Sequence, residues 1–442
     1  MRYKTRESNR ANLIRVYAAL LSIIVMVLGG LLITPTVHAA NTSEKVTVKV
    51  AKKAKKKTIT VYVGDKIQLE VKSGSKTIKQ NKAIYKTNNK KLATVNKKGL
   101  ITVKKTGTAK ITVTTKDKKK YSCVVTLKIK KKSDKPKVVA SSISLNEKSV
   151  EIKQGESYQL VATVYPENTT DKTLEWEVND PSVLSVSPSG VITGLKSGYT
   201  SVWVYNKKNG AYASSYCEVT VKGKISKSGT AGSNITYTVS GYEGDATLTL
   251  AGSGLMTNFG IGESPWYDYH NDITTVNIGS GITSVGDCAF YYFTNMTSVT
   301  IPNTITRIGK YAFSDCEKIT AFNIPSSVTT VGEEAFAFCK SLTSIPLPAS
   351  ITNLDTFVFT YDSNLSTAVI NCNISTLPAA TFSNCTNLQK VWIPAVGLID
   401  MYAFDKCTNL TDIYYAGTAT EWNNVTIQSD NAPVTTATIH TN

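Results

Sequence analysis

A phenylalanine that returns at a nearly constant interval in the second half of the chain constrains the fold more than any other feature. Its successive spacings are 23, 23, 23, 23 and 22 residues, and it occupies Phe290, Phe313, Phe336, Phe359, Phe382 and Phe404. A short period repeated this often is typical of a solenoid, in which each repeat covers the apolar side of its neighbour. The second half is therefore predicted to be one stack of repeats.

The residues after each phenylalanine alternate in polarity. Apolar side chains recur six, nine and eleven positions later, as Met296, Val299 and Ile301 do in the first repeat, and Ser298 and Thr300 stand between them. Alternation over so short a run predicts a β-strand with one buried face. One strand per repeat gives a parallel sheet, with neighbouring strands about 4.8 Å apart. The outward residues of successive strands then form an exposed column.

The third position after the phenylalanine is cysteine in four of the six repeats. It is occupied by Phe293, Cys316, Cys339, Asp362, Cys385 and Cys407. A position that also accepts phenylalanine and aspartate does not supply the fixed ligands of a metal site. Equivalent side chains of parallel neighbours point the same way, which suits a disulfide poorly. Free, buried thiols are predicted, and bridges between Cys316 and Cys339 or between Cys385 and Cys407 are the alternative.

The repeats resemble the BspA-like leucine-rich repeat family of bacterial surface proteins. The segments that carry the resemblance are "ITSVGDCAF", "ITRIGKYAFSDCEKIT" and "VTTVGEEAFAFCKSLTSIPLP". The resemblance implies six repeats in residues 282–417, a lead-in and N-terminal cap in residues 223–281, and a C-terminal cap and tail in residues 418–442. Trp266 and Trp422 are expected to cover the open ends of the core. Repeats four and five lack the glycine of Gly286, Gly309 and Gly332, but their register is expected to persist.

The first half of the chain repeats once, at an offset of 91 residues. Gly64, Gln68 and Leu69 fall on Gly155, Gln159 and Leu160, and the offset continues without a gap, with Tyr85 on Trp176 and Val113 on Val204. Each copy consists of short, alternating, β-branched segments separated by Gly, Asn, Asp and Lys turns. About seven such strands in some 85 residues are typical of a small antiparallel sandwich.

The second copy, from "SISLNEKSVEIKQGESYQL" onward, resembles the bacterial Ig-like group 2 (BIG2) domain, and the first copy resembles it more loosely. This places one sandwich in residues 46–132 and another in residues 140–222. The resemblance implies an extracellular spacer or weakly adhesive module without catalytic residues. Cys123 and Cys217, one in each copy, are expected to be buried apolar side chains. The predicted fold class is mainly β: two Ig-like sandwiches followed by a leucine-rich-repeat solenoid with a parallel sheet.

Residues 1–39 have the order of a secretory signal peptide. Five Lys or Arg residues precede an uncharged apolar run, "VYAALLSIIVMVLGGLLIT", and small residues follow up to Ala39. An uncleaved membrane anchor is the alternative, because the run approaches the length that spans a bilayer. The membrane would then be contacted only through this segment. Either way, the rest of the chain is expected outside the cytoplasm, secreted or at the cell surface.

The net charge of +18 is unevenly distributed. Residues 41–140 hold 30 Lys and only 5 acidic residues, whereas residues 141–442 carry a net charge of −11. The lysines have no aromatic residues interleaved for base stacking, so nucleic acid is not expected as a partner. A solvated surface is one reading of this charge. The functional hypothesis is that the first domain binds anionic cell-wall polymers or anionic lipid headgroups.

No catalytic apparatus is recognisable. The three histidines, His38, His270 and His440, lie in the signal segment, the N-terminal cap and the tail, and no hydrolase, metalloprotease or nucleotide-binding motif is present. We expect no catalytic residues, no metal and no cofactor, and hence not an enzyme. The predicted function is adhesion or ligand binding through the sheet face, with an unknown protein or glycan as partner. The alternatives are a wall-associated spacer without a ligand and a glycan-binding module.

The candidate binding residues are four outward residues of the last two repeats: Lys390, Trp392, Asp412 and Tyr414. Aromatic side chains on adjacent strands are frequent anchors of interfaces. The alternative is that these two rings cover the end of the core near the cap.

Overall fold

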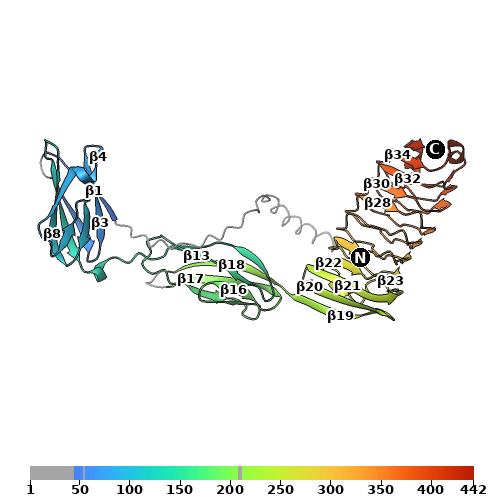
Figure 1. Ribbon diagram of the computed structural model, residues 1–442, viewed down its shortest axis with the longest axis horizontal. Helices are drawn as coiled ribbons and strands as arrows, with labels where there is room; N and C mark the ends of the chain where they lie inside the picture. The colour runs from blue at the N-terminus through green and yellow to red at the C-terminus, as the bar shows by residue number, and fades with distance from the viewer. Residues whose placement is uncertain (1–43, 53–54, 208–211) are drawn as a thin grey trace, which may run out of the picture. The chain divides into compact units, whose positions relative to one another are not determined.

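The computed structural model describes residues 44–52, 55–207 and 212–442, and Figure 1 shows their strands. The predicted signal segment, residues 1–39, lies outside the described residues. Within them, no helix combines the length and apolar character needed to cross a membrane. The chain divides between Pro136 and Lys137 into two compact units.

The first unit contains a sandwich of two sheets. One sheet has the order β1-β3-β7-β6, with β4 paired to β3, and the other has the order β2-β9-β8-β5. The strands of the first sheet are β1 (Glu44–Lys49), β3 (Lys66–Ser73), β4 (Lys76–Ile78), β6 (Ala93–Val95) and β7 (Leu100–Val103). Those of the second are β2 (Lys55–Tyr62), β5 (Ala83–Thr87), β8 (Gly107–Thr115) and β9 (Ser122–Lys130). The expected antiparallel pairing holds except for β1 with β3 and β2 with β9, which run parallel.

The second sandwich keeps the parallel pairing of its second strand with its last, but its first strand pairs antiparallel and several of its strands are shorter. It is built from β10 (Ser142–Leu145), β11 (Ser149–Lys153), β12 (Ser157–Gln159), β13 (Ala162–Tyr165), β14 (Glu175–Val178), β15 (Leu184–Val186), β16 (Val191–Gly194), β17 (Gly198–Asn206) and β18 (Ala213–Lys222). A Cβ atom on Gly190 would come within 2.6 Å of the Trp176 ring, and one on Gly99 within 2.9 Å of the Tyr85 ring. The 91-residue repeat therefore keeps a glycine because an aromatic ring packs against its backbone in both copies.

The repeat region begins with three antiparallel strands, β19 (Lys224–Gly232), β20 (Ile235–Tyr242) and β21 (Asp245–Gly254). They continue into the parallel strands β22 (Ile273–Ile278) and β25 (Ser298–Thr300). Trp266 is fully buried and stacks on Phe290 with ring centroids 5.9 Å apart. The prediction that Trp266 closes the N-terminal end of the core is confirmed.

The predicted phenylalanine stack is confirmed along the whole solenoid. Successive ring centroids from Phe290 to Phe404 are 5.3, 5.7, 5.7, 5.6 and 5.5 Å apart, and all six rings are fully buried. The register persists through repeats four and five despite their missing glycines. The outward strands of the later repeats are β28 (Ser344–Leu347), β30 (Thr367–Ile370), β32 (Lys390–Ile393) and β34 (Asp412–Tyr415), and they pair in parallel. Figure 1 shows these strands side by side.

A second set of parallel sheets is built from strands of two residues each. They are β24 (Ser284–Val285), β26 (Arg307–Ile308), β27 (Thr330–Val331) and β29 (Asn353–Leu354), followed by β31 (Thr376–Leu377), β33 (Leu398–Ile399) and β35 (Thr426–Ile427).

Two features differ from the prediction of one strand after the phenylalanine of each repeat. The second repeat has no strand at residues 319–324. Phe322 stands there in place of a smaller side chain, and it packs against Phe313 and Phe336 at 5.2 and 4.6 Å between ring centroids. Its ring needs more room than an aliphatic group, which explains the local break. At the other end, the predicted tail contributes a strand, β36 (Thr438–His440), which pairs in parallel with β34.

All eight cysteines are free and buried, so the alternative of disulfide bridges is wrong. In the repeats, each thiol of the cysteine column donates to the carbonyl oxygen of a phenylalanine one repeat earlier. The Sγ–O distances are 3.4 Å for Cys316 to Phe290, 3.3 Å for Cys339 to Phe313, 3.0 Å for Cys385 to Phe359 and 3.1 Å for Cys407 to Phe382. Cysteine thus supplies a small apolar body and one weak donor.

The phenylalanine column has its own hydrogen-bond ladder with a fixed polarity. Each phenylalanine N–H from Phe290 to Phe382 donates to a carbonyl of the next repeat, at N–O distances of 2.8 to 3.1 Å. In the first repeat, a carbonyl therefore has no N–H of a preceding repeat to accept from. In the last repeat, an N–H has no carbonyl of a following repeat to donate to. The indole Nε1 of Trp266 donates to the Ala289 carbonyl at 2.7 Å, and the Asn431 Oδ1 accepts from the Phe404 N–H at 2.9 Å. Two side chains replace the missing repeats.

Candidate functional site

The four predicted binding residues lie together on two adjacent parallel strands. Lys390 is paired with Asp412, and Trp392 with Tyr414, in the register of β32 and β34. The Trp392 and Tyr414 rings are stacked, with centroids 4.4 Å apart and planes inclined by 6°. Parallel strands place equivalent side chains directly beside each other, so two outward aromatic residues at the same repeat position must stack.

The structure adds His440, which the sequence prediction had assigned to the tail. Its ring stacks on Tyr414 with centroids 4.3 Å apart, so three rings from β32, β34 and β36 form one row. The alternation of "ATIH" was the available signal, because Ala437 and Ile439 pack against the core and His440 faces outward. His440 lies 26 residues after Tyr414 and not 23, so the repeat period does not identify it as an equivalent position.

The row is flanked by charged groups. The His440 Nε2 lies 2.8 Å from the Asp412 Oδ1, and the Thr411 hydroxyl donates to the other Asp412 oxygen at 2.8 Å. Hydrogen bonds from His440 and Thr411 lower the pKa of the Asp412 carboxyl. Lys390 is exposed beside this pair. The site therefore presents an apolar stack bordered by a carboxylate and a cation.

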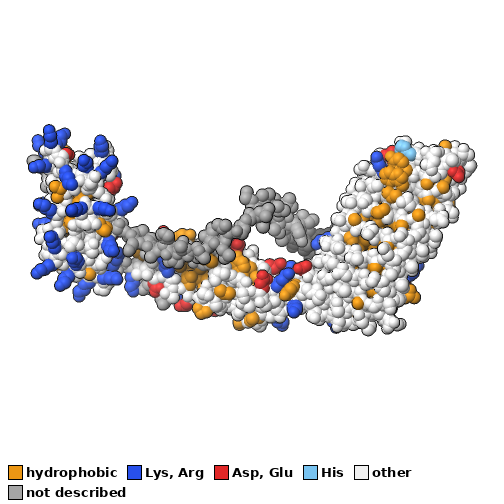
Figure 2. Space-filling view, viewed as in Figure 1, with side chains coloured by type: hydrophobic (Ala, Val, Ile, Leu, Met, Phe, Trp, Pro, Cys, Tyr) orange, Lys and Arg blue, Asp and Glu red, His pale blue; other side chains and the backbone are white. Residues whose placement is uncertain are grey.

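A hollow of about 370 Å³ adjoins the rings on the side where the strands end. Its lining combines the three rings with the residues that follow each strand, among them Asn371, Pro394, Ala416, Thr441 and Asn442. Asn442 is held by hydrogen bonds from its side chain to the Ala416 carbonyl (2.6 Å) and from its N–H to the Gly417 carbonyl (2.9 Å). An apolar surface with a few oriented polar groups is the usual character of a ligand site. Figure 2 shows hydrophobic side chains gathered at this end of the repeat region.

The groups gathered at the site are two aromatic rings, an imidazole, a carboxylate and an ammonium group. In the described part of the chain, no group of three or more His, Cys, Asp or Glu residues could hold a metal ion. The His440–Asp412 pair resembles two members of a triad, but no described hydroxyl group bonds to the remaining His440 nitrogen. His270 stacks on Tyr267, and its Nδ1 lies 2.7 Å from the Tyr267 carbonyl oxygen.

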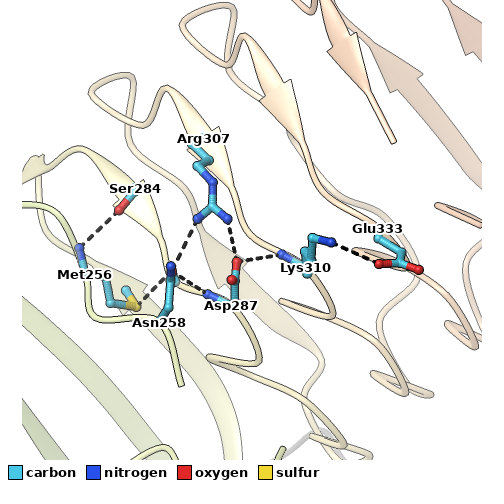
Figure 3. Close-up of polar contacts among 8 residues, drawn as sticks. Met256, Asn258, Ser284, Asp287, Arg307, Lys310 and Glu333 are labelled. Atoms are coloured by element: carbon cyan, nitrogen blue, oxygen red, sulfur yellow. Dashed lines mark hydrogen bonds and ion pairs between the residues drawn. The ribbon is translucent and has the colours of Figure 1, made fainter. Parts of the chain in front are cut away.

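A second polar cluster, in the first repeats, was not singled out by the sequence (Figure 3). The Arg307 guanidinium contacts the Asp287 carboxylate at 2.6 Å and the Asn258 Oδ1 at 3.3 Å. The Lys310 Nζ contacts Glu333 at 3.1 Å, and the backbone N–H of Lys310 donates to the Asp287 Oδ1 at 2.9 Å. Asp287, Lys310 and Glu333 are 23 residues apart, so the charges alternate between neighbouring repeats. These contacts connect the lead-in to the first three repeats.

Comparison with protein-family models identifies both halves of the chain. Six copies of the BspA type leucine rich repeat region match within residues 261–389 and 306–431. The bacterial Ig-like domain (group 2) matches residues 51–125 and 139–215. The chain therefore carries two Ig-like group 2 domains followed by a BspA-type leucine-rich repeat region, and neither is an enzyme family.

Individual relatives match only parts of the chain. An uncharacterized protein of Clostridium acetobutylicum is 37% identical over 83 residues, which are 19% of this chain and 21% of the relative. A leucine-rich repeat protein structure from Bacteroides ovatus is 20% identical with a TM-score of 0.34, over 42% of this chain and 55% of that one. A leucine rich cell surface protein of Faecalibacterium prausnitzii is 23% identical with a TM-score of 0.23, over 37% of this chain and 65% of that one.

Proposed function

We propose that this chain, in which two bacterial Ig-like group 2 domains precede a BspA-type leucine-rich repeat region, is a non-catalytic extracellular protein that binds a ligand through its repeat sheet. The observation that carries the proposal is the row of Trp392, Tyr414 and His440 beside a hollow of about 370 Å³. The Ig-like domains serve as a spacer for this surface. The order of residues 1–39, typical of a secretory signal, supports an extracellular location.

The ring row is a local feature of the sheet and not a property of every repeat. On β28 and β30, the positions equivalent to Trp392 are Pro346 and Val369. Large rings therefore stand only on the last three strands, next to the hollow. Aromatic side chains supply contact area at a small entropic cost, because they have two side-chain torsions. Asn371, Thr441 and Asn442 add donors and acceptors that can orient a protein or a glycan ligand.

The test is a binding screen of the chain from residue 40 to residue 442 against extracellular matrix proteins and glycans. The double variant Trp392→Ser/Tyr414→Ser should lose at least about 30-fold in affinity for any ligand found, because an aromatic hot spot contributes about 2 kcal/mol or more. Phe338 and Tyr361 form a matched control, since their rings also stack on adjacent repeats (4.8 Å, 6°) but do not line the hollow. Phe338→Ser/Tyr361→Ser should leave binding within threefold.

A structural spacer without a ligand is the second candidate, and one observation favours it. The rings of the row cover one another's faces, so stacking alone accounts for part of their burial. This candidate predicts no ligand in the screen and a large fall in the melting temperature of Trp392→Ser/Tyr414→Ser. The ligand-binding proposal predicts a fall of only a few degrees together with lost binding. Hits confined to sugars would identify a glycan-binding module.

A further inference from the structure

The first Ig-like domain contains two adjoining hollows, each of about 790 Å³, around the short 3₁₀ turn Gln80–Lys82. Both are lined by Lys79, Asn81 and Lys116. The turn is fixed by hydrogen bonds from the Lys82 N–H to the Lys79 carbonyl (2.8 Å) and from the Lys116 N–H to the Lys82 carbonyl (2.9 Å). The backbone that carries these lysines is therefore held in one place.

Six lysines and a single acid line the two hollows. The lysines, all exposed, are Lys76, Lys79, Lys82, Lys97, Lys98 and Lys116. In the described part of the first unit, the ion pairs are formed by Lys72 and Lys135, which line neither hollow. The one acid, Asp117, already accepts from the Thr115 hydroxyl at 2.7 Å and from the Lys120 N–H at 3.0 Å. The six ammonium groups thus face one carboxylate, and none of them forms an ion pair with it or with any other described acid.

The second Ig-like domain offers an internal comparison. It has a hollow of about 340 Å³ at the same place, lined by Trp176, Pro188 and Ser189. By the 91-residue offset, these residues correspond to Tyr85, Lys97 and Lys98 of the first domain. Residues 46–132 hold 27 lysines against 3 acidic residues, whereas residues 140–222 hold 7 against 9. The hollow belongs to the fold, and the excess of positive charge around it belongs to the first copy, since the second hollow is lined by one lysine, Lys172.

A buried polar atom marks the same place. Tyr85 lines the first hollow, and its hydroxyl oxygen is buried without a hydrogen-bond partner among the described residues. A buried donor without a partner is unfavourable by about 1–3 kcal/mol. Burial raises the pKa of this hydroxyl, so it stays a donor at neutral pH.

We propose that these two hollows bind a flexible polyanion whose charges are phosphate groups, a poly(phosphodiester) chain without bases. Six ammonium groups without an ion-pair partner, set around concave surfaces, match an anionic chain that can bend into them. Tyr85 is the one aromatic residue in the lining of the first hollow and the second hollow has none, so neither provides a series of rings for stacking bases. A flat anionic bilayer would contact lysines anywhere on the domain and would not need the hollows. Figure 2 shows lysines over the whole visible face of this domain.

The test compares two variants of equal charge in the chain from residue 40 to residue 442. The hollow variant replaces Lys76, Lys79, Lys82, Lys97, Lys98 and Lys116 by Gln. The control variant replaces six exposed lysines outside the hollows, Lys90, Lys104, Lys105, Lys110, Lys128 and Lys130, by Gln. Binding to immobilised poly(glycerol phosphate) is measured against salt. Each phosphate contact contributes about 0.7 to the slope of log K against log salt for single-stranded chains.

The hollow variant should bind roughly 100-fold more weakly, with a slope smaller by up to about 4, and the control variant should stay within threefold of the unchanged protein. Equal losses in the two variants would overturn the proposal, since diffuse charge would then explain binding. It would also be overturned if vesicles of phosphatidylcholine and phosphatidylglycerol in equal parts, or single-stranded DNA, bound more tightly than the polymer.

Lysine footprinting of the unchanged protein gives a result that does not depend on variant folding. Reductive methylation with and without the polymer should protect the six hollow lysines and leave the six control lysines reactive. Uniform protection, or none, would contradict the assignment. The outcome is independent of the ring row on the repeat sheet, so failure here leaves the proposed ligand binding untouched, and the reverse also holds.

Discussion

Asn431 closes the C-terminal end of the phenylalanine ladder, and replacing it should open that end selectively. Its side chain is 3% exposed, and its Oδ1 accepts from the Phe404 N–H at 2.9 Å. Its Nδ2 donates to the carbonyls of Asp400, Gln428 and Ser429 at 2.8, 3.1 and 3.3 Å. One amide therefore joins the last repeat to the segment that follows it.

The magnitude follows from the groups that Asn431→Ala would leave behind. The Asp400 carbonyl still accepts from the Ala403 N–H, and the Ser429 carbonyl from the Tyr402 N–H. The Phe404 N–H has no other acceptor among the described residues, so it becomes a buried donor without a partner. That loss is unfavourable by about 1–3 kcal/mol, which raises the local opening equilibrium by roughly 5- to 150-fold.

Hydrogen exchange read by mass spectrometry is the suitable assay, because a chain with several domains has no single unfolding free energy. Peptides that contain Phe404 should exchange faster by the stated factor in Asn431→Ala. In a solenoid each repeat contacts only its neighbours, so the effect should fall off toward Phe382 and be absent at Phe313. Thr435→Ala is a matched control, since Thr435 lies exposed in the short helix that follows Asn431, α3 (Ala432–Thr436).

Two results would refute this reasoning. Unchanged exchange at Phe404 would mean that the amide is satisfied in another way, and an equal increase along all repeats would mean that the cap acts globally. Asn431→Asp separates the two halves of the side chain. It keeps the acceptor for Phe404 but sets a carboxylate against the three carbonyls. Faster exchange in this variant near neutral pH would therefore report the lost donor and not the lost acceptor, and it should disappear in acid, where the carboxyl can donate.

Two further predictions concern the repeats themselves. Asp362 is fully buried, and burial raises its carboxyl pKa well above the usual range. The protonated carboxyl therefore contributes its full stability below the unfolded pKa of about 3.9. That contribution is lost as pH rises through the raised folded pKa. Asp362→Asn should thus stabilise the repeats more at pH 8 than at pH 4 in urea unfolding, and an equal change at both pH values would contradict this. Lys406 has a φ of 58°, a conformation unfavourable by about 1 kcal/mol for residues with a Cβ, so Lys406→Gly should raise the unfolding midpoint; Lys340→Gly, at an exposed site outside the left-handed region, should lower it.

The stack of phenylalanines, the parallel strands and the free thiols could be predicted because each of these positions has nearly the same environment in successive repeats. Periodicity alone then identifies which side chains face inward. The same reasoning failed at Phe322, where one ring larger than its counterparts removed a strand. A period reports the average environment of a position and not the space available in one repeat.

The row of three rings was predicted in part for the same reason. Trp392 and Tyr414 share a repeat position, so their stacking follows from the spacing. His440 and the hollow could not be predicted this way, because residues 418–442 fold without the period. The lysine-lined hollows of the first domain were indicated only as an excess of charge, since burial and lining depend on the paired strands and not on composition.

The end of the solenoid is also where new side chains can appear with the fewest constraints. Inside the stack, every position packs between two like neighbours, so a changed residue must suit both the preceding and the following repeat. After the last repeat, the chain only has to cover the core and supply an acceptor to Phe404. The segment that does so carries His440 and Asn442, which complete the ring row and line the hollow. Capping the ladder and building the candidate site are thus achieved by one stretch of about 25 residues, which explains why the row lies at the end of the sheet and not at its centre.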